Sequence, residues 1–276
     1  MSTSASGTGR GAEAADLRSL AAAYEQAQRV RVELGERIRA AARDGAGLLE
    51  RIRAGATDGP APLLGRTYRR HWEQERELAR GMAEALDAHP AWRWLRGVHG
   101  VGPTLGCRLL ARLDLDRARN PSAFWAYCGL ATVPGVEYRC DACGLVRSFP
   151  AEQDVAGPHR RRGDGSACTG RLVPTGGSGG VRVAQPRTRP GERGAYDGEA
   201  KRICYLIGAS FLQTDGPYRD YYDAERERLA RAQPAWSPAR QHLTALRKTE
   251  KRFLRDLWVE WRSALGLPAS APAEPA

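Results

Sequence analysis

Three cysteines and one histidine between residues 140 and 168 have the spacing of a metal site. Cys140 and Cys143 have two residues between them and are followed by Gly144, an arrangement typical of a tight turn that presents two thiolates. Cys168 supplies a third sulfur, and His159 is the best fourth donor, which gives Cys-x2-Cys-x15-His-x8-Cys. This donor set suits tetrahedral zinc in a structural role, because four protein ligands close the site. The alternative is a pair of free cysteines in a turn.

A second pattern that could bind a ligand is WLRGVHGVGPTLGCRLLARL at 94–113. Gly100 and Gly102 can both adopt positive φ, and Pro103 suits the first position of a new helix. The first amides of that helix have no acceptor within it and lie at the positive end of its dipole, which predicts an anion pocket. We expect the groups that bind one phosphate oxygen to come from the backbone or hydroxyls of Gly100, Val101, Gly102 and Thr104.

The apolar spacing around this turn is similar to that of the helix-hairpin-helix element, which grips a phosphate of duplex DNA without reading bases. Leu95, Val98 and Leu109 stand where that element has apolar residues, while Gly106 stands where it prefers alanine. The alternative is an ordinary glycine-containing turn between two core helices.

Positive charge is concentrated beside the cysteines. Residues 157–193 hold eight arginines against two carboxylates, and the whole chain has a net charge of +11. These arginines predict a zinc-braced flap along a phosphate backbone, for which the first candidates are Arg160, Arg161 and Arg162. The alternative is a solvated loop. Further cations expected at the phosphates are Arg96, Arg108, Lys201 and Arg202.

The elements that must position these residues are mostly helical. Amphipathic spacing predicts helices over 16–53 and 63–88, which form either an antiparallel hairpin or a dimerising coiled coil. A short helix follows Pro121, helical periodicity stops over 131–198, and helices resume from Glu199 and from Pro238 to Leu265. Residues 1–15 and 266–276 are expected to be disordered tails.

Composition excludes some classes. No apolar run reaches the roughly 18–20 residues of a membrane span, and the N-terminus lacks the apolar core of a signal peptide. Six cysteines without a secretory signal favour metal ligands or buried thiols over disulfides. We therefore expect a cytoplasmic protein without a membrane partner.

Beyond the hairpin, AFWAYCGL at 123–130 and AKRICYLIGASFLQTDGPYRDYYDAERERL at 200–229 resemble the C-terminal domain of the bridge-RNA-guided insertion-sequence transposases of bacteria. The resemblance covers roughly residues 92–230. It implies a nucleophilic serine, and Ser178, in TGGSGG, is the one serine-glycine that can be carried over; the same stretch also has the composition of a linker. Family members carry an N-terminal RNase H-like domain with four metal-binding acids, whereas this chain has helices there.

The expected fold is mainly α: a helical hairpin at 16–90, a helix-hairpin-helix transposase-like domain at 91–135 and 198–265, and a zinc-ribbon-like basic insertion at 136–197. The expected function is duplex DNA binding without catalysis by the chain itself, with structured RNA as another partner and homodimerisation through the N-terminal helices. Two alternatives stay open. One is a transposase or recombinase that uses Ser178 with a partner supplying the acidic site. The other is a coiled-coil interaction protein, for which DNA binding would be insensitive to salt.

Overall fold

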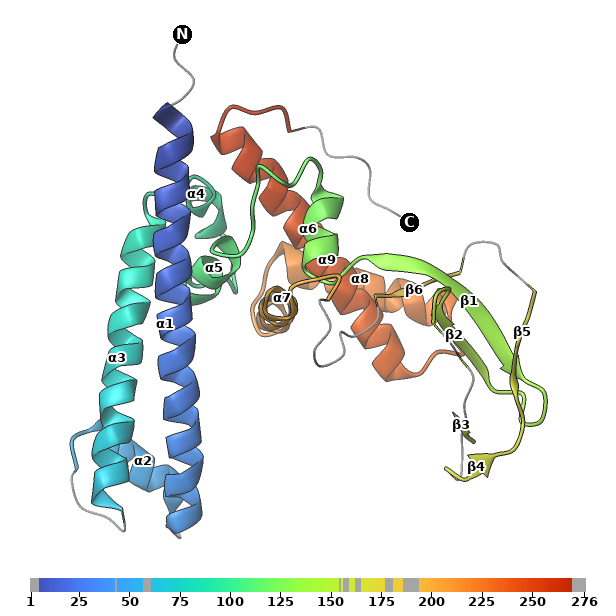
Figure 1. The fold of residues 1–276 in the computed structure, drawn as a ribbon, viewed down its shortest axis with the longest axis horizontal. Helices are drawn as coiled ribbons and strands as arrows, with labels where there is room; N and C mark the ends of the chain where they lie inside the picture. Colours follow the sequence, from blue (N-terminus) through green and yellow to red (C-terminus); the bar gives the residue numbers. More distant parts are fainter. Residues whose placement is uncertain are drawn as a thin grey trace.

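The structure, a computed structural model, describes nine helices and a small sheet (Figure 1). The residues described are 5–42, 44–56, 61–153, 155, 159–161, 165–176, 181–185 and 194–269, with the backbone alone for 5–14. The mainly helical class predicted from the sequence is confirmed.

The N-terminal part is a helical hairpin made by α1 (Ala5–Ala41) and α3 (Pro62–Leu86), which are joined through α2 (Gly45–Arg53) (Figure 1). The apolar stripe of α1 faces α3 and is buried at Leu17, Ala21, Tyr24, Ala27, Leu34 and Ile38. This arrangement matches the antiparallel hairpin among the two alternatives. Homodimerisation through these helices stays a prediction. The apolar stripe of α1 that would support it is covered within one chain.

The predicted limits of the first helix are wrong at both ends. α1 begins at Ala5, so residues 5–15 of the expected tail are helical; residues 1–4 lie outside the described part. A single helix over 16–53 is also wrong, because Asp44 accepts a hydrogen bond from the Gly47 amide at 3.0 Å and starts a new helix there. A local capping interaction therefore ends the longer helix that periodicity predicted.

The central and C-terminal helices build the main core. Their limits are α4 (Trp92–Leu95), α5 (Pro103–Leu110), α6 (Pro121–Tyr127), α7 (Gly198–Phe211), α8 (Pro217–Ala232) and α9 (Pro238–Ala264). Three of them begin at residues whose side chains accept an amide hydrogen bond from the first turn: Asn120, Asp197 and Ser237. Of the expected C-terminal tail, residues 270–276 lie outside the described part.

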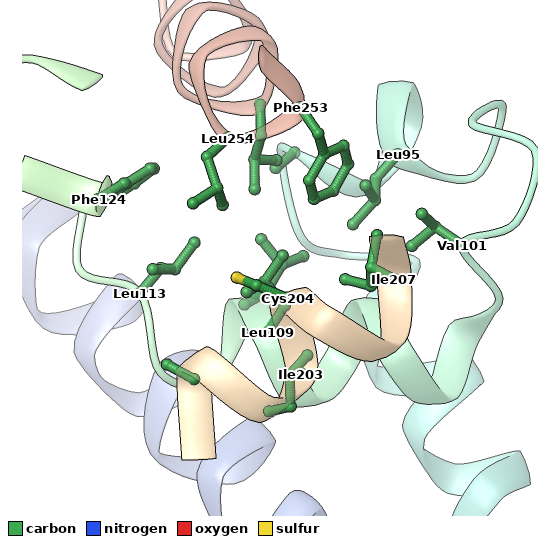
Figure 2. Packing of buried hydrophobic residues seen from close by; sticks show 14 of the residues in the cluster. Leu95, Val101, Leu109, Leu113, Phe124, Ile203, Cys204, Ile207, Phe253 and Leu254 are labelled. Carbon is green, nitrogen blue, oxygen red and sulfur yellow. The ribbon is translucent and has the colours of Figure 1, made fainter. Parts of the chain in front are cut away.

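These helices pack around one apolar cluster (Figure 2). Leu109 of α5, Ile203 and Ile207 of α7, and Phe253 and Leu254 of α9 are almost completely buried there. Cys107, Cys128 and Cys204 are buried in the same cluster, as expected for small apolar residues. The core thus joins α5 to segments about one hundred residues further along the chain.

The sheet occupies the region where helical periodicity stops. β1 (Thr132–Cys140) pairs antiparallel with β2 (Val146–Pro150) and also, at its two ends, with β5 (Leu172–Pro174) and β6 (Arg182–Ala184). β3 (His159–Arg160) and β4 (Ala167–Cys168) form a separate two-stranded pair. The sheet lies beside α8 and the N-terminal half of α9 (Figure 1). No helix in the described part of the chain is long and apolar enough to span a membrane.

Candidate nucleic-acid interface and metal centre

The turn between α4 and α5 has its apolar residues inward and its glycine backbone outward. Leu95, Val101 and Leu109 are buried, and Figure 2 shows Leu95 and Val101 directed toward the cluster that contains Ile207 and Phe253. Gly102 and Pro103 are exposed at the apex. A Cβ built on Gly102 meets no atom within 4 Å. The start of α5 is therefore open to a ligand.

The two glycines of this turn have different conformations. Gly100 has φ +91°, the left-handed region that favours glycine, whereas Gly102 has φ −77° and ψ 170°, which any residue adopts. Of the two glycines to which positive φ is available, only Gly100 adopts it. What glycine provides at 102 is the absence of a side chain over the amides of Thr104 and Leu105, which have no acceptor within α5.

The turn is fixed by the segment between α7 and α8. A Cβ on Gly100 would lie 3.1 Å from Thr214 Oγ1 and 3.2 Å from Phe211 Cδ1. His99 Nδ1 lies 3.0 Å from the carbonyl oxygen of Asp215. Gly106, the departure from the helix-hairpin-helix pattern, has a packing reason, because a Cβ there would lie 2.8 Å from Trp92 Cζ3. Contacts with the segment between α7 and α8 fix one side of the turn, while the side at Gly102 is exposed to solvent.

Two of the residues predicted to bind phosphate are already engaged. The Val101 amide donates to the Val98 carbonyl at 3.0 Å, so it is a wrong choice of phosphate donor. Arg108 is also wrong: its side chain is 3% exposed and binds Glu25 and Glu199, each at 3.0 Å. This arginine joins α1, α5 and α7 instead of facing a ligand.

Lys201 and Arg202 do not reach the turn either. They lie near the start of α7, whereas the turn contacts the end of that helix, about 13 Å away along the axis. Arg202 forms an ion pair with Glu199, and the Lys201 amine lies 4.5 Å from the centre of the Tyr196 ring. Arg96 is exposed just after α4, and its contact with a phosphate stays a prediction.

The four predicted metal ligands come together. The ligand atoms of Cys140, Cys143, His159 and Cys168 all lie within 4.8 Å of one another, so the cluster could hold a metal ion. The Cys140 and Cys168 sulfurs are 3.7 Å apart, and Cys143 Sγ lies 3.3 Å from His159 Nε2. A tetrahedral ion about 2.3 Å from each sulfur places two sulfurs about 3.8 Å apart, which the first distance matches.

Local backbone structure presents these ligands. Cys140 ends β1, and the β3–β4 pairing places His159 opposite Cys168. The amides of Cys143 and Ala142 donate to the Cys140 sulfur, each at 3.4 Å, and these hydrogen bonds, the Cys143 amide foremost, lower the pKa of that thiol to about 6. Gly170 leaves necessary room, because a Cβ there would lie 2.6 Å from the Cys140 sulfur.

The arginine-rich flap is described only in part. Arg160 and Arg161 are exposed next to the metal cluster, and Arg160 also donates to the Gly165 carbonyl at 2.9 Å. Arg162 and Ser178 lie outside the described residues. Figure 1 places β3 and β4 far from α4 and α5, so the flap and the hairpin do not form one local site.

A further row of cations, on α9, is absent from the sequence predictions. One face of that helix carries the cations of the row: Arg240, Arg247, Lys248, Lys251, Arg252 and Arg255. The spacing at 240, 247, 251 and 255 was a visible signal, since these positions share one side of a helix. The sequence could not show which element faces them.

Comparison with models of known protein families, and with curated proteins, gives no match.

Proposed function

We propose that this chain binds duplex DNA through phosphate oxygens, with the turn before α5 as its grip. The observation that carries the proposal is the open apex at Gly102, above amides that α5 cannot satisfy. The exposed Arg93 and Arg96 add positive charge next to it. Phosphate contacts of this kind give affinity without base recognition, so we expect weak sequence preference and strong salt dependence.

The proposal includes descent from the transposases that the sequence resembles. The resemblance rests on residues 100–103, 124–130 and 201–222, and the sheet separates the last segment from the first two in sequence. In the structure they pack into one core, where Phe124, Cys204 and Ile207 share the apolar cluster with Leu109. A shared core is what a single ancestral domain with an insertion between its halves requires.

A Gly102→Asp substitution tests the grip. Gly102 has the extended conformation of a helix N-cap, and an aspartate there can accept the Thr104 or Leu105 amide. It should therefore preserve or slightly raise stability while it occupies the amides and repels phosphate. We expect duplex affinity, measured by fluorescence anisotropy with a random 20-base-pair DNA, to fall at least tenfold with an unchanged melting temperature.

The matched control is Gly198→Asp. Gly198 is also exposed at a helix start, and a Cβ there meets no atom within 4 Å. The control adds the same charge and should retain duplex binding to within about twofold. Normal binding by Gly102→Asp, or equal losses in both variants, would show that the apex is not the grip.

We also infer that the Cys140–Cys143–His159–Cys168 cluster holds a structural zinc ion in a zinc-ribbon-like fold. Three thiolates and one imidazole suit zinc, whose binding would stabilise strands that bury little apolar surface. The purified protein should contain about one zinc per chain by elemental analysis. Cys143→Ser should lose it and increase amide exchange in β1–β5, while helices α5, α7 and α9 stay protected. The control is His71→Asn in α3, which should keep its zinc. If wild-type protein freed of zinc shows the same amide-exchange protection in β1–β5 as before zinc removal, the assignment is wrong.

A further inference from the structure

A groove of about 920 Å³ separates the sheet from α9. One wall comes from β1, β2 and β6. The other comes from α9, with Trp125 of α6, Tyr221 near the start of α8 and Trp236 between α8 and α9. Eight lysines and arginines line it, together with Glu137 as the one carboxylate in the described lining. The Glu137 carboxylate accepts a hydrogen bond from the Thr175 hydroxyl and supplies one negative charge against the eight positive charges of the lining.

Most of these cations are not neutralised by the protein. Five of the eight have no carboxylate oxygen within 4.0 Å among the residues described: Arg147, Arg182, Arg240, Arg247 and Lys251. Lys248, by contrast, pairs with Glu225 at 3.3 Å. A concave surface with uncompensated positive charge attracts anions strongly, because its walls focus the field.

Aromatic rings hold several of the cations in place. The Arg240 guanidinium lies 4.0 Å from the centre of the Trp236 ring, and the Lys251 amine lies 5.1 Å from that of Trp125. Arg252 lies 4.5 Å from the centre of the Tyr221 ring. A ring positions a cation through its quadrupole but leaves the full charge in place, whereas a carboxylate would cancel it.

Cations also face one another across the groove. Burial lowers the pKa of Lys251, and the positive charges of Arg247, Arg182 and Lys248 lower it further. Arg182 belongs to β6 on the opposite wall, where its side chain donates to Thr132 Oγ1 at 2.8 Å. Like charges on two close walls repel until an anion lies between them.

We propose that this groove binds a single-stranded nucleic acid. A chain of phosphates supplies one anion after another between the two rows of cations, and the partly exposed rings of Tyr221 and Trp236 offer surfaces for unpaired bases. The sheet walls the cationic face of α9, so this helix cannot enter the major groove of a duplex. The proposal is independent of duplex binding at the hairpin.

The length of the cationic row suits several nucleotides. Arg240 and Arg255 are separated by about 22 Å along α9, at 1.5 Å per residue. Phosphates in one stacked strand are about 3.4 Å apart along its axis, so the row can face about six of them. A 12-nucleotide probe is therefore long enough to fill the groove.

The test measures binding of fluorescent 12-nucleotide oligo-dT and oligo-U to the full chain at 50 and 200 mM salt. Both strands should bind, since the lining recognises phosphates and ring faces shared by DNA and RNA. Arg247→Gln with Lys251→Gln should lower the affinity at least tenfold and reduce the slope of log affinity against log salt by about 1.4, or 0.7 for each lost contact. If neither strand binds wild-type protein, the proposal is wrong.

The matched control is Arg66→Gln with Arg70→Gln, which removes the same charge from exposed positions on α3. It should change single-strand affinity by less than about twofold. Equal losses in both double variants would mean general attraction to a basic protein, and would overturn the proposal. Gly102→Asp should lower duplex affinity alone, which separates failure of the groove from failure of the hairpin.

Photo-cross-linking gives a second readout that does not depend on a variant that folds. A bromodeoxyuridine 12-mer irradiated with wild-type protein should cross-link to peptides that contain Tyr221 or Trp236. Cross-links confined to peptides outside the groove would contradict the proposal.

Discussion

Arg108 on α5 and Lys251 on α9 are both substantially shielded from water, but their surroundings have opposite signs. Arg108 lies between two carboxylates, those of Glu25 and Glu199, and Arg112 binds Glu25 as well at 2.9 Å. Lys251 faces an aromatic ring and three other cations. One cation completes a buried network, and the other is left with its charge uncompensated.

The difference separates charge that stabilises the fold from charge that awaits a ligand. A buried cation is costly unless it is paired, so the helix junction at Arg108 is built from complementary groups. At the groove the protein retains repulsion that it could have relieved with an acidic residue. Such repulsion lowers stability, and the binding of an anionic partner would offset it.

Removing Arg108 should produce the largest loss of stability in this comparison. Arg108→Met leaves Glu25 and Glu199 with one cation fewer at a buried junction of three helices. We expect the free energy of unfolding to fall by about 3 kcal/mol, the lower end for breaking a buried pair, because Arg112 and Arg202 still bind these carboxylates. Urea unfolding followed by circular dichroism measures it.

Arg202→Met is the control, since Arg202 pairs with the same Glu199 but is 48% exposed. Its loss should cost less than about 1 kcal/mol, the usual value of a surface ion pair. If the two variants lose similar amounts of unfolding free energy, burial of the Arg108 ion pairs adds no stability beyond that of a surface ion pair. The contrast with the groove would then be weaker.

The Cys140–Cys143–His159–Cys168 cluster and the turn between α4 and α5 could be predicted from sequence because both depend on local spacing. Cys140, Cys143 and Gly144 specify one turn, and Gly100 with Pro103 specifies another. His159 and Cys168 lie outside the Cys140–Gly144 turn, and the short β3–β4 pairing places them opposite each other. In these places residue type and spacing already determine which atoms meet.

The role of Arg108 and the existence of the groove could not be predicted in the same way. Arg108 is distant from Glu25 and from Glu199 in the sequence by 83 and 91 residues, and only the packing of α1 and α7 brings them together. The spacing of the basic residues indicates a basic face on α9. The sheet that faces it lies in a stretch without helical periodicity, so the sequence did not show that the two elements meet. Charge patterns reveal where cations are, whereas tertiary packing decides which of them are neutralised.

A buried acid next to the groove, Glu250, bears on whether the groove cation Arg247 is neutralised. Glu250 is 5% exposed on α9, and its side chain lies against Gly208 of α7. Burial raises its pKa from 4.5 to about 8, although the positive charges of Arg247 and Lys201 oppose the shift. At neutral pH this carboxyl is largely protonated, so it leaves the charge of Arg247 in place.

The pH dependence of stability tests this account of Glu250. Its folded-state pKa is raised, so its favourable contribution is complete below pH 4.5 and is lost as the pH rises toward about 8. Glu250→Gln mimics the protonated form. We therefore expect the variant to match wild type near pH 4.5 and to exceed its free energy of unfolding by about 4 kcal/mol at pH 8.

Glu227→Gln on α8 is the matched control, because Glu227 is 72% exposed and its ion pair with Arg231 is a surface contact. It should show no such divergence between pH 4.5 and 8. If Glu250→Gln instead destabilises the protein across this whole range, the carboxylate is ionised and neutralises Arg247. The groove would then carry one uncompensated cation fewer than the contrast with Arg108 requires.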